Sequence, residues 1–163
     1  MVIMRAAATP AGKAYSEGQA RINEKKWPEA IAAFQNCVAL DANHSKAWFE
    51  LGYTYYEQNG KKSCEAQYEP YTRCIALDPT NAAAHNNLGL VLEEVRKDYD
   101  GAERHYRKAI ELDPKYTFAH WNLSLLVENQ KNDIPGAVKL VEECVRLGRA
   151  NCEQRLAKLR AKL

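Results

Sequence analysis

The stretch from Ala84 to Pro114, AHNNLGLVLEEVRKDYDGAERHYRKAIELDP, decides the fold. Apolar residues recur at helical spacing in both of its halves: Leu88, Val91, Leu92 and Val95, then Ala102, Tyr106, Ala109, Ile110 and Leu112. This pattern predicts two amphipathic helices joined by a short turn. The second helix must end near Pro114, because proline cannot continue a helix. Since neither helix can bury its apolar stripe alone, we expect the two to pack together.

Degraded copies of this stretch lie on both sides of it at nearly constant spacing. Gly89 is inside the first predicted helix, where glycine costs about 1 kcal/mol relative to alanine, so we expect a neighbouring helix to approach closely there. The Gly89 position recurs as Gly18, Gly52 and Ser124. The Tyr106 position recurs as Phe34, Tyr71 and Val141. The chain is therefore predicted to contain four repeats, residues 11–44, 45–79, 80–114 and 115–149.

The repeats resemble the tetratricopeptide repeat family, whose unit of about 34 residues carries Trp, Leu-Gly, Tyr, Ala, Phe and Pro at fixed positions. The second repeat matches the first half of this signature with Trp48, Leu51, Gly52 and Tyr55. The third repeat matches its second half with Ala102, Tyr106, Ala109 and Pro114. The resemblance implies an all-α fold, a right-handed α-solenoid of antiparallel helix pairs with about four units.

The two ends of the chain do not fit the repeat. Residues 1–9 are expected to be a frayed N-terminus, and the repeats then occupy residues 10–149. In residues 150–163 one helical stripe contains Cys152, Leu156, Leu159 and Leu163. A solenoid leaves an apolar flank on its last repeat, so this segment is predicted to be a capping helix. Its basic face could instead contact a membrane or nucleic acid, but the stripe would then be unavailable for packing.

The second repeat is irregular. It has a few extra residues, most naturally between Asn59 and Ser63, and Pro70 falls where its second helix should be continuous. We predict a kink or a late helix start near Pro70. Either the irregularity is simply tolerated, or it reshapes the binding surface.

Composition limits the classes of function. The net charge of +2 is too small to favour nucleic acid or an anionic membrane as partner. No apolar run approaches the length of a membrane span, and Arg5 interrupts the only candidate signal core, so we expect a cytoplasmic protein.

Three of the five cysteines, Cys37, Cys74 and Cys144, occupy the same small apolar position as Ala109. Equivalent positions in neighbouring repeats are about 8–10 Å apart or more, beyond the reach of a disulfide. These cysteines are predicted to be buried packing residues.

The resemblance also implies that the first helices of successive repeats line a concave groove that binds peptides. The candidate peptide-binding residues carried over in this way are Phe49, Tyr53, Tyr56, Asn86, Asn87, Leu90, Glu93, Phe118, Trp121, Asn122, Leu125 and Glu128. The aromatic residues among them, together with Tyr15, are not needed for the apolar stripe. Exposed aromatic rings beside polar groups are typical of partner sites. The alternative is that these rings pack against neighbouring helices.

Asn87 and Asn122 share one repeat position, with Glu50 at the corresponding place in the second repeat. Side-chain amides both donate to and accept from a peptide backbone. This arrangement resembles the asparagine ladders with which some tetratricopeptide proteins hold extended peptides. Asparagine is also common at this position in the family for other reasons, and that alternative stays open.

Family members that bind the acidic C-terminus of chaperones use Lys and Arg at groove positions. The corresponding residues here are Tyr15, Gln19, Glu50, Ala83 and Asn87, or one repeat later Phe49, Tyr53, Asn87, Phe118 and Asn122. None is a cation, so we do not expect a chaperone C-terminal carboxylate as ligand. The carboxylates on this face are Glu57, Glu93, Glu94 and Glu128. We expect a preference for an apolar segment that carries Lys or Arg.

Nothing in the sequence favours catalysis. It contains no phosphate-binding loop and no nucleophile motif, and His85 and His120 occupy equivalent repeat positions too far apart to share a metal. We expect no cofactor and no metal. The leading hypothesis is a non-catalytic protein interaction module with a scaffold or adaptor role. One alternative is a structural protein that self-associates through its repeat ends, and we expect the chain to be a monomer or to self-associate weakly. The other alternative is an RNA-binding helical repeat, which the acidic residues disfavour.

Overall fold

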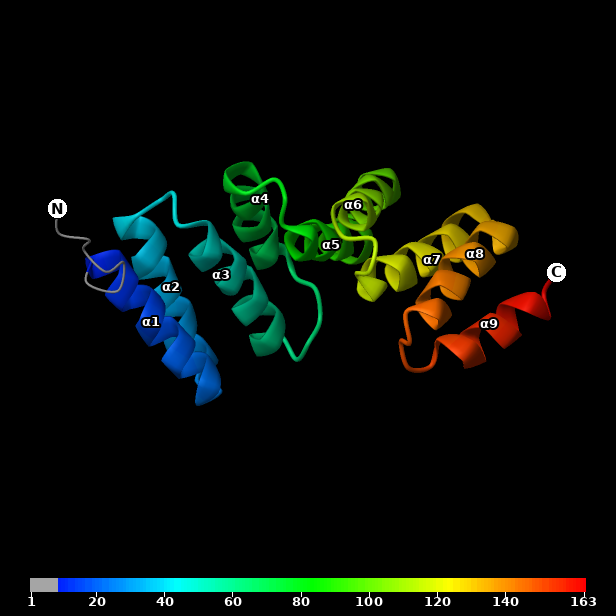
Figure 1. Ribbon diagram of the computed structural model, residues 1–163. Coiled ribbons are helices and arrows are strands. Elements are labelled where there is room, and N and C mark those ends of the chain that lie inside the picture. Colours follow the sequence, from blue (N-terminus) through cyan, green and yellow to red (C-terminus); the bar gives the residue numbers. More distant parts are fainter. Residues whose placement is uncertain (1–8) are drawn as a thin grey trace, which may run out of the picture. The chain divides into compact units, whose positions relative to one another are not determined.

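The computed structural model describes residues 9–163, whose helices are labelled in Figure 1. The chain consists of two units, divided between Pro79 and Thr80. The predicted frayed N-terminus lies outside the described residues except for Thr9. Every regular element of residues 9–163 is helical, and consecutive helices pack against each other within each unit. The predicted fold class, an all-α solenoid of helix pairs, is confirmed.

The first unit contains two helix pairs: α1 (Pro10–Asn23), α2 (Trp27–Leu40), α3 (Ser45–Gln58) and α4 (Tyr68–Leu77). Local sequence fixes where these helices begin. Thr9 Oγ1 accepts a hydrogen bond from the backbone N–H of Gly12 at 3.0 Å, and Pro10 opens α1. Pro28 lies in the first turn of α2, where a missing N–H has no cost. Both prolines thus lie at helix starts, where their fixed backbone geometry is already that of a helix.

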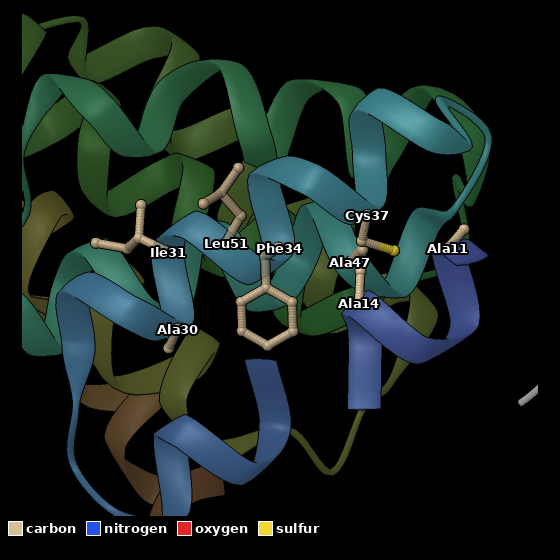
Figure 2. Packing of buried hydrophobic residues seen from close by; sticks show 8 residues of the cluster. All are labelled: Ala11, Ala14, Ala30, Ile31, Phe34, Cys37, Ala47 and Leu51. Carbon is tan, nitrogen blue, oxygen red and sulfur yellow. The ribbon is translucent and has the colours of Figure 1, made fainter. Parts of the chain in front are cut away.

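The core of the first unit forms where the helices of a pair face each other. Figure 2 shows Phe34 within a cluster that includes Ala14, Ala30, Cys37 and Ala47. The Phe34 ring is fully buried, and a Cβ atom added to Gly18 would lie 2.5 Å from its Cε1 atom. Gly18 therefore leaves the space that the ring fills.

The same pairing of glycine and aromatic ring recurs along the chain. A Cβ on Gly52 would lie 2.7 Å from Cε1 of Tyr71, and one on Gly89 would lie 2.6 Å from Cε1 of Tyr106. Both tyrosines are buried. The close helix approach predicted at the Gly89 position is confirmed in these three copies, and it explains why the sequence tolerates glycine inside a helix.

The second helix of the irregular second repeat begins late. After α3 ends at Gln58, an extended segment leads to a short 3-10 turn, Glu65–Gln67, and α4 begins only at Tyr68. Pro70 thus lies in the first turn of α4 and interrupts no helical hydrogen bond. Gln67 is buried, and its side chain bonds the backbone N–H of Cys64 at 2.7 Å and the carbonyl of Gly52 at 3.3 Å.

The second unit contains α5 (Ala82–Val91), α6 (Tyr99–Leu112), α7 (Thr117–Lys131), α8 (Ile134–Arg146) and α9 (Cys152–Arg160). Helix α5 continues as one π-helical turn, Leu92–Arg96, which the apolar spacing does not predict. Asp98 and Asp133 cap α6 and α8 by accepting hydrogen bonds from the N–H groups of Gly101 and Gly136.

Helix α9 packs on α8 through buried Cys152, Leu156 and Leu159. The predicted stripe is too long at its end, because α9 stops at Arg160 and Leu163 is 73% exposed. The capping segment is therefore shorter than residues 150–163.

All five cysteines are free thiols. Cys37, Cys74 and Cys144 are fully buried, as predicted, and so is Cys152. Burial raises the pKa of Cys37 and of Cys74, and burial next to Cys152 raises the pKa of Cys144 to about 12. Cys64, in the segment before α4, is the one that remains partly exposed.

In the part of the chain that the structure describes, every helix falls short of the length and apolar character that a membrane crossing requires.

Candidate functional site

In the first unit the candidate residues lie on α3. Phe49, Tyr53 and Tyr56 are all half-buried. The Phe49 ring lies 6.0 Å from the core ring of Tyr71, and the Tyr53 hydroxyl donates a hydrogen bond to Glu57 Oε1 at 2.9 Å. These rings therefore have one side in the protein and part of their surface open, which is intermediate between the two alternatives considered from the sequence.

A carboxylate without a partner lies among these rings. Glu50 is half-buried, and within residues 9–163 its carboxylate receives no hydrogen bond and forms no ion pair. Burial raises the pKa of Glu50. Burial and, after it, the charge of Glu50 raise the pKa of Tyr15 on α1. The pKa of Tyr53 is raised to about 12 by burial and by Glu57. The first unit thus presents a partly dehydrated negative charge flanked by tyrosines.

In the second unit the asparagines bond to one another. The Asn122 Nδ2 group on α7 donates to Asn86 Oδ1 on α5 at 2.9 Å, and Asn86 Nδ2 donates to Asn87 Oδ1 at 3.1 Å. Asn86 is only 2% exposed. Its amide therefore orients Asn122 and Asn87, which are half-buried, instead of offering itself to a ligand.

The side chain of Glu93, in the π-helical turn, is fixed by a hydrogen bond to a core residue. It accepts a hydrogen bond from the buried Tyr106 hydroxyl at 2.8 Å, and burial raises its pKa. The neighbouring Glu94 is exposed. Leu90 and Leu125, the apolar candidates on α5 and α7, are half-buried.

The charge of Glu128 is compensated, which corrects the expected acidic face. Arg155 Nη2 lies 2.7 Å from Glu128 Oε2, and Lys162 Nζ lies 2.6 Å from Glu128 Oε1. Hydrogen bonds from both cations lower the pKa of Glu128, whose side chain is 11% exposed. The basic residues after Gly148 are visible in the sequence, but their proximity to α7 requires the fold.

The same terminal segment brings arginines to the aromatic candidates of α7. The Arg149 Cζ atom lies 4.2 Å from the centre of the Phe118 ring and 5.2 Å from that of Trp121. Arg155 Cζ lies 5.3 Å from the Trp121 ring. Phe118 is 54% exposed. Sequence reasoning missed Arg149 because it is the last residue of the fourth repeat, outside the first helices to which the family pattern assigns ligand contacts.

The histidines also form a contact that periodicity could not indicate. His85 on α5 is buried, and its Nδ1 atom lies 3.0 Å from Nδ1 of His105 on α6. Burial and the neighbouring His85 lower the pKa of His105 to about 4. His120 is buried separately, with Nε2 2.9 Å from the Pro114 carbonyl oxygen. Among the described residues no three His, Cys, Asp or Glu side chains come together as a metal site.

The repeated helix pairs, three of them with an aromatic ring of the second helix packed against a glycine of the first, define a helical-repeat protein. Sequence profiles of the tetratricopeptide repeat match residues 15–62 and 71–104, which together make up about half of the chain. The chain belongs to the tetratricopeptide repeat family, whose members are typically non-catalytic protein interaction modules.

Solved structures show the same fold. The crystal structure of MamA aligns with a TM-score of 0.75 at 25% identity, over 91% of this chain and 81% of that chain. MamA 41-end from Desulfovibrio magneticus RS-1 aligns with a TM-score of 0.73 at 21% identity, over 86% and 77%. YrrB, described as a TPR protein with an unusual peptide-binding site, aligns with a TM-score of 0.74 at 17% identity, over 94% and 75%. No curated protein sequence matches the chain.

Proposed function

We propose that this chain is a non-catalytic module that binds a peptide or helix of a partner protein on the first helices of its repeats, as a cytoplasmic scaffold or adaptor. In the first unit these helices are α1 and α3, and in the second they are α5 and α7. The observation that carries the proposal is that Tyr53, Tyr56 and Trp121 keep open surface although the core packs without them. Aromatic rings of this kind dominate binding energy at protein interfaces. The likeness to YrrB supports the same function.

Polar groups beside the rings would orient the ligand. Asn87 and Asn122 are positioned by Asn86, so a peptide backbone meets amides that are already ordered. Preorganised groups lose less entropy on binding than mobile ones.

The charge preference of the first unit follows from Glu50. Binding a Lys or Arg side chain would give its dehydrated carboxylate the partner that it lacks, and the hydroxyl-bonded Glu57 lies on the same helix. We therefore expect this unit to prefer apolar segments with a basic residue. A chaperone C-terminal carboxylate is not an expected ligand, because the family's clamp positions carry no cation here.

Selection from a library of short random peptides displayed on phage tests the proposal. Wild-type protein is expected to enrich apolar peptides, and Tyr53→Ala together with Trp121→Ala should abolish that enrichment. Tyr99→Ala is the matched control, because it removes a partly exposed ring from α6, outside the site. Equal enrichment by the double variant and wild type would contradict the proposal.

The charge preference is tested in the same selection. Lys and Arg should be over-represented among peptides enriched by wild type, and Glu50→Gln should remove this bias while apolar enrichment remains. A wild-type selection without any Lys or Arg bias would refute the charge preference alone.

A further inference from the structure

The second unit carries a patch whose positive charge is opposite to that of the Glu50 carboxylate in the first unit. We call Phe118, Trp121 and Arg149 the arginine–aromatic patch. The two rings belong to α7, and Arg149 lies in the turn between α8 and α9. Its guanidinium lies over the Phe118 ring at 4.2 Å and within 5.2 Å of Trp121, so it contacts both rings.

The cations near this patch differ in what they already bind. Arg155 donates to Glu128 at 2.7 Å and to Ser124 Oγ at 3.3 Å, and Lys162 takes the other oxygen of Glu128. Arg149 has no carboxylate within ion-pair distance in residues 9–163. Two of these cations thus share one carboxylate, whereas Arg149, which lies over an exposed ring, has no counter-charge.

We infer that the arginine–aromatic patch binds the carboxylate of an Asp or Glu side chain in a partner peptide. This inference rests on the proposed function and specifies the ligand for the second unit. A guanidinium over an aromatic ring keeps N–H donors that can form paired hydrogen bonds to a planar carboxylate. The rings exclude water from one side of the arginine, which strengthens the charge interaction, and they offer apolar contact to the residues that flank the acid.

A peptide fits this surface better than a nucleic acid. Recognition of a phosphate backbone uses several cations in a row, whereas here Arg155 and Lys162 are already paired with Glu128. The exposed Glu94 and the partly buried Glu93 belong to the same unit and would repel a polyanion. One free arginine with two rings matches one acidic side chain within an otherwise apolar segment.

The experiment is the same random peptide selection, read for acidic residues. Wild type is expected to enrich peptides that contain Asp or Glu, and Arg149→Gln should lose that enrichment while keeping the enrichment of apolar residues. Arg146→Gln is the matched control. It removes an exposed arginine three residues earlier, which pairs with Glu143 on the surface, and it should behave as wild type.

An acidic peptide recovered in this selection is then synthesised with its acid replaced by Gln. Wild type should bind the acidic form roughly tenfold more tightly by fluorescence anisotropy, and Arg149→Gln should bind both forms equally. Arg149→Lys, which keeps the charge but not the planar group, should retain only part of the difference.

The outcomes separate this inference from the function on which it rests. Enriched peptides without Asp or Glu, or an acidic preference that persists in Arg149→Gln, would overturn the inference and leave peptide binding intact. Failure of wild type to enrich any peptide would overturn both. Circular dichroism of each variant establishes that the fold is unchanged before the comparison is made.

Discussion

At the scale of single residues, three glycines determine how tightly the helix pairs close. Gly18, Gly52 and Gly89 each face an aromatic ring at a distance that leaves no room for a methyl group. Glycine lowers the stability of a helix, and here this loss is offset because only glycine lets the aromatic ring pack so close to the helix backbone. The rings cannot move aside easily, because Phe34, Tyr71 and Tyr106 are buried.

Gly89→Ala is therefore expected to destabilise the protein, although alanine is the better helix former. Overpacking against the Tyr106 ring should cost about 2 kcal/mol and lower the melting temperature in calorimetry. Ser124→Ala is the matched control, because this position of the fourth repeat already accommodates a side chain and should lose less stability. An unchanged or higher melting temperature for Gly89→Ala would show that the ring has room to move.

The His85–His105 contact predicts a pH dependence. The pKa of His105 is about 4 in the folded chain and about 6.5 when unfolded, so between these values the unfolded state binds protons more readily. Its contribution to stability is complete above pH 6.5 and is lost as pH falls toward 4. The groups that face His105 electrostatically are His85, Arg104 and Asp98, and burial outweighs all of them.

Urea unfolding at pH 7.5 and pH 5 measures this effect. Wild type should lose about 1–2 kcal/mol more than His105→Gln between the two values, less than the full shift corresponds to because His105 is partly exposed. Comparing the two proteins cancels the titration of the carboxylates that they share. Identical losses in both would mean that His105 titrates normally in the folded chain.

At the scale of elements, the sequence predicts helices well and contacts between distant helices poorly. Pro10, Pro28 and Pro70 mark helix starts because a missing N–H is tolerated in the first turn and nowhere else. The close helix contacts at the glycines are also predictable, because glycine lowers the stability of a helix and is retained there only where a neighbouring side chain needs the space.

The ion pairs that balance the charge of Glu128, and the contact between His85 and His105, leave no such pattern in the local sequence. Each joins residues of different helices, and nothing in the spacing of polar residues indicates which charged groups will meet. The repeat pattern assigns Glu128 to a binding face, whereas its partners Arg155 and Lys162 belong to a segment outside the repeats. The open surface of the aromatic candidates is therefore predictable from the repeat pattern, whereas the ion pairs of Glu128 are not.

The contribution of the terminal helix α9 to stability can be measured at one buried residue. Leu159 is 1% exposed, so Leu159→Ala should leave a cavity and destabilise the protein by about 2–4 kcal/mol in urea unfolding. Leu163→Ala is the matched control, because Leu163 is exposed and should change stability by less than about 0.5 kcal/mol. If Leu159→Ala were equally harmless, α9 would not stabilise the second unit.

At the scale of the whole molecule, each unit has a core of its own. Phe34 and Cys37 are buried within the first unit, and Tyr106 and Leu123 within the second. In repeat proteins stability is approximately a sum of contributions from each repeat and its neighbours, so parts of an array can fold separately. The second unit also carries α9, which covers α8.

The fragment Thr80–Leu163 is therefore expected to fold without the first unit. Circular dichroism should show a helical spectrum and a cooperative thermal transition, at a temperature below that of the full chain. The fragment with Leu123→Ala is the control, and its transition should move further down because Leu123 is fully buried. A fragment without a cooperative transition would mean that the second unit depends on the first.

The distribution of the cysteines allows local unfolding to be followed by thiol labelling. Four of the five thiols are fully buried and one, Cys64, is partly exposed, so a maleimide dye should attach to Cys64 alone while the chain is folded. The remaining thiols become reactive only when their own helices open, Cys37 and Cys74 in one unit, Cys144 and Cys152 in the other. Mass spectrometry of the labelled chain would then count adducts and reveal which half opens first.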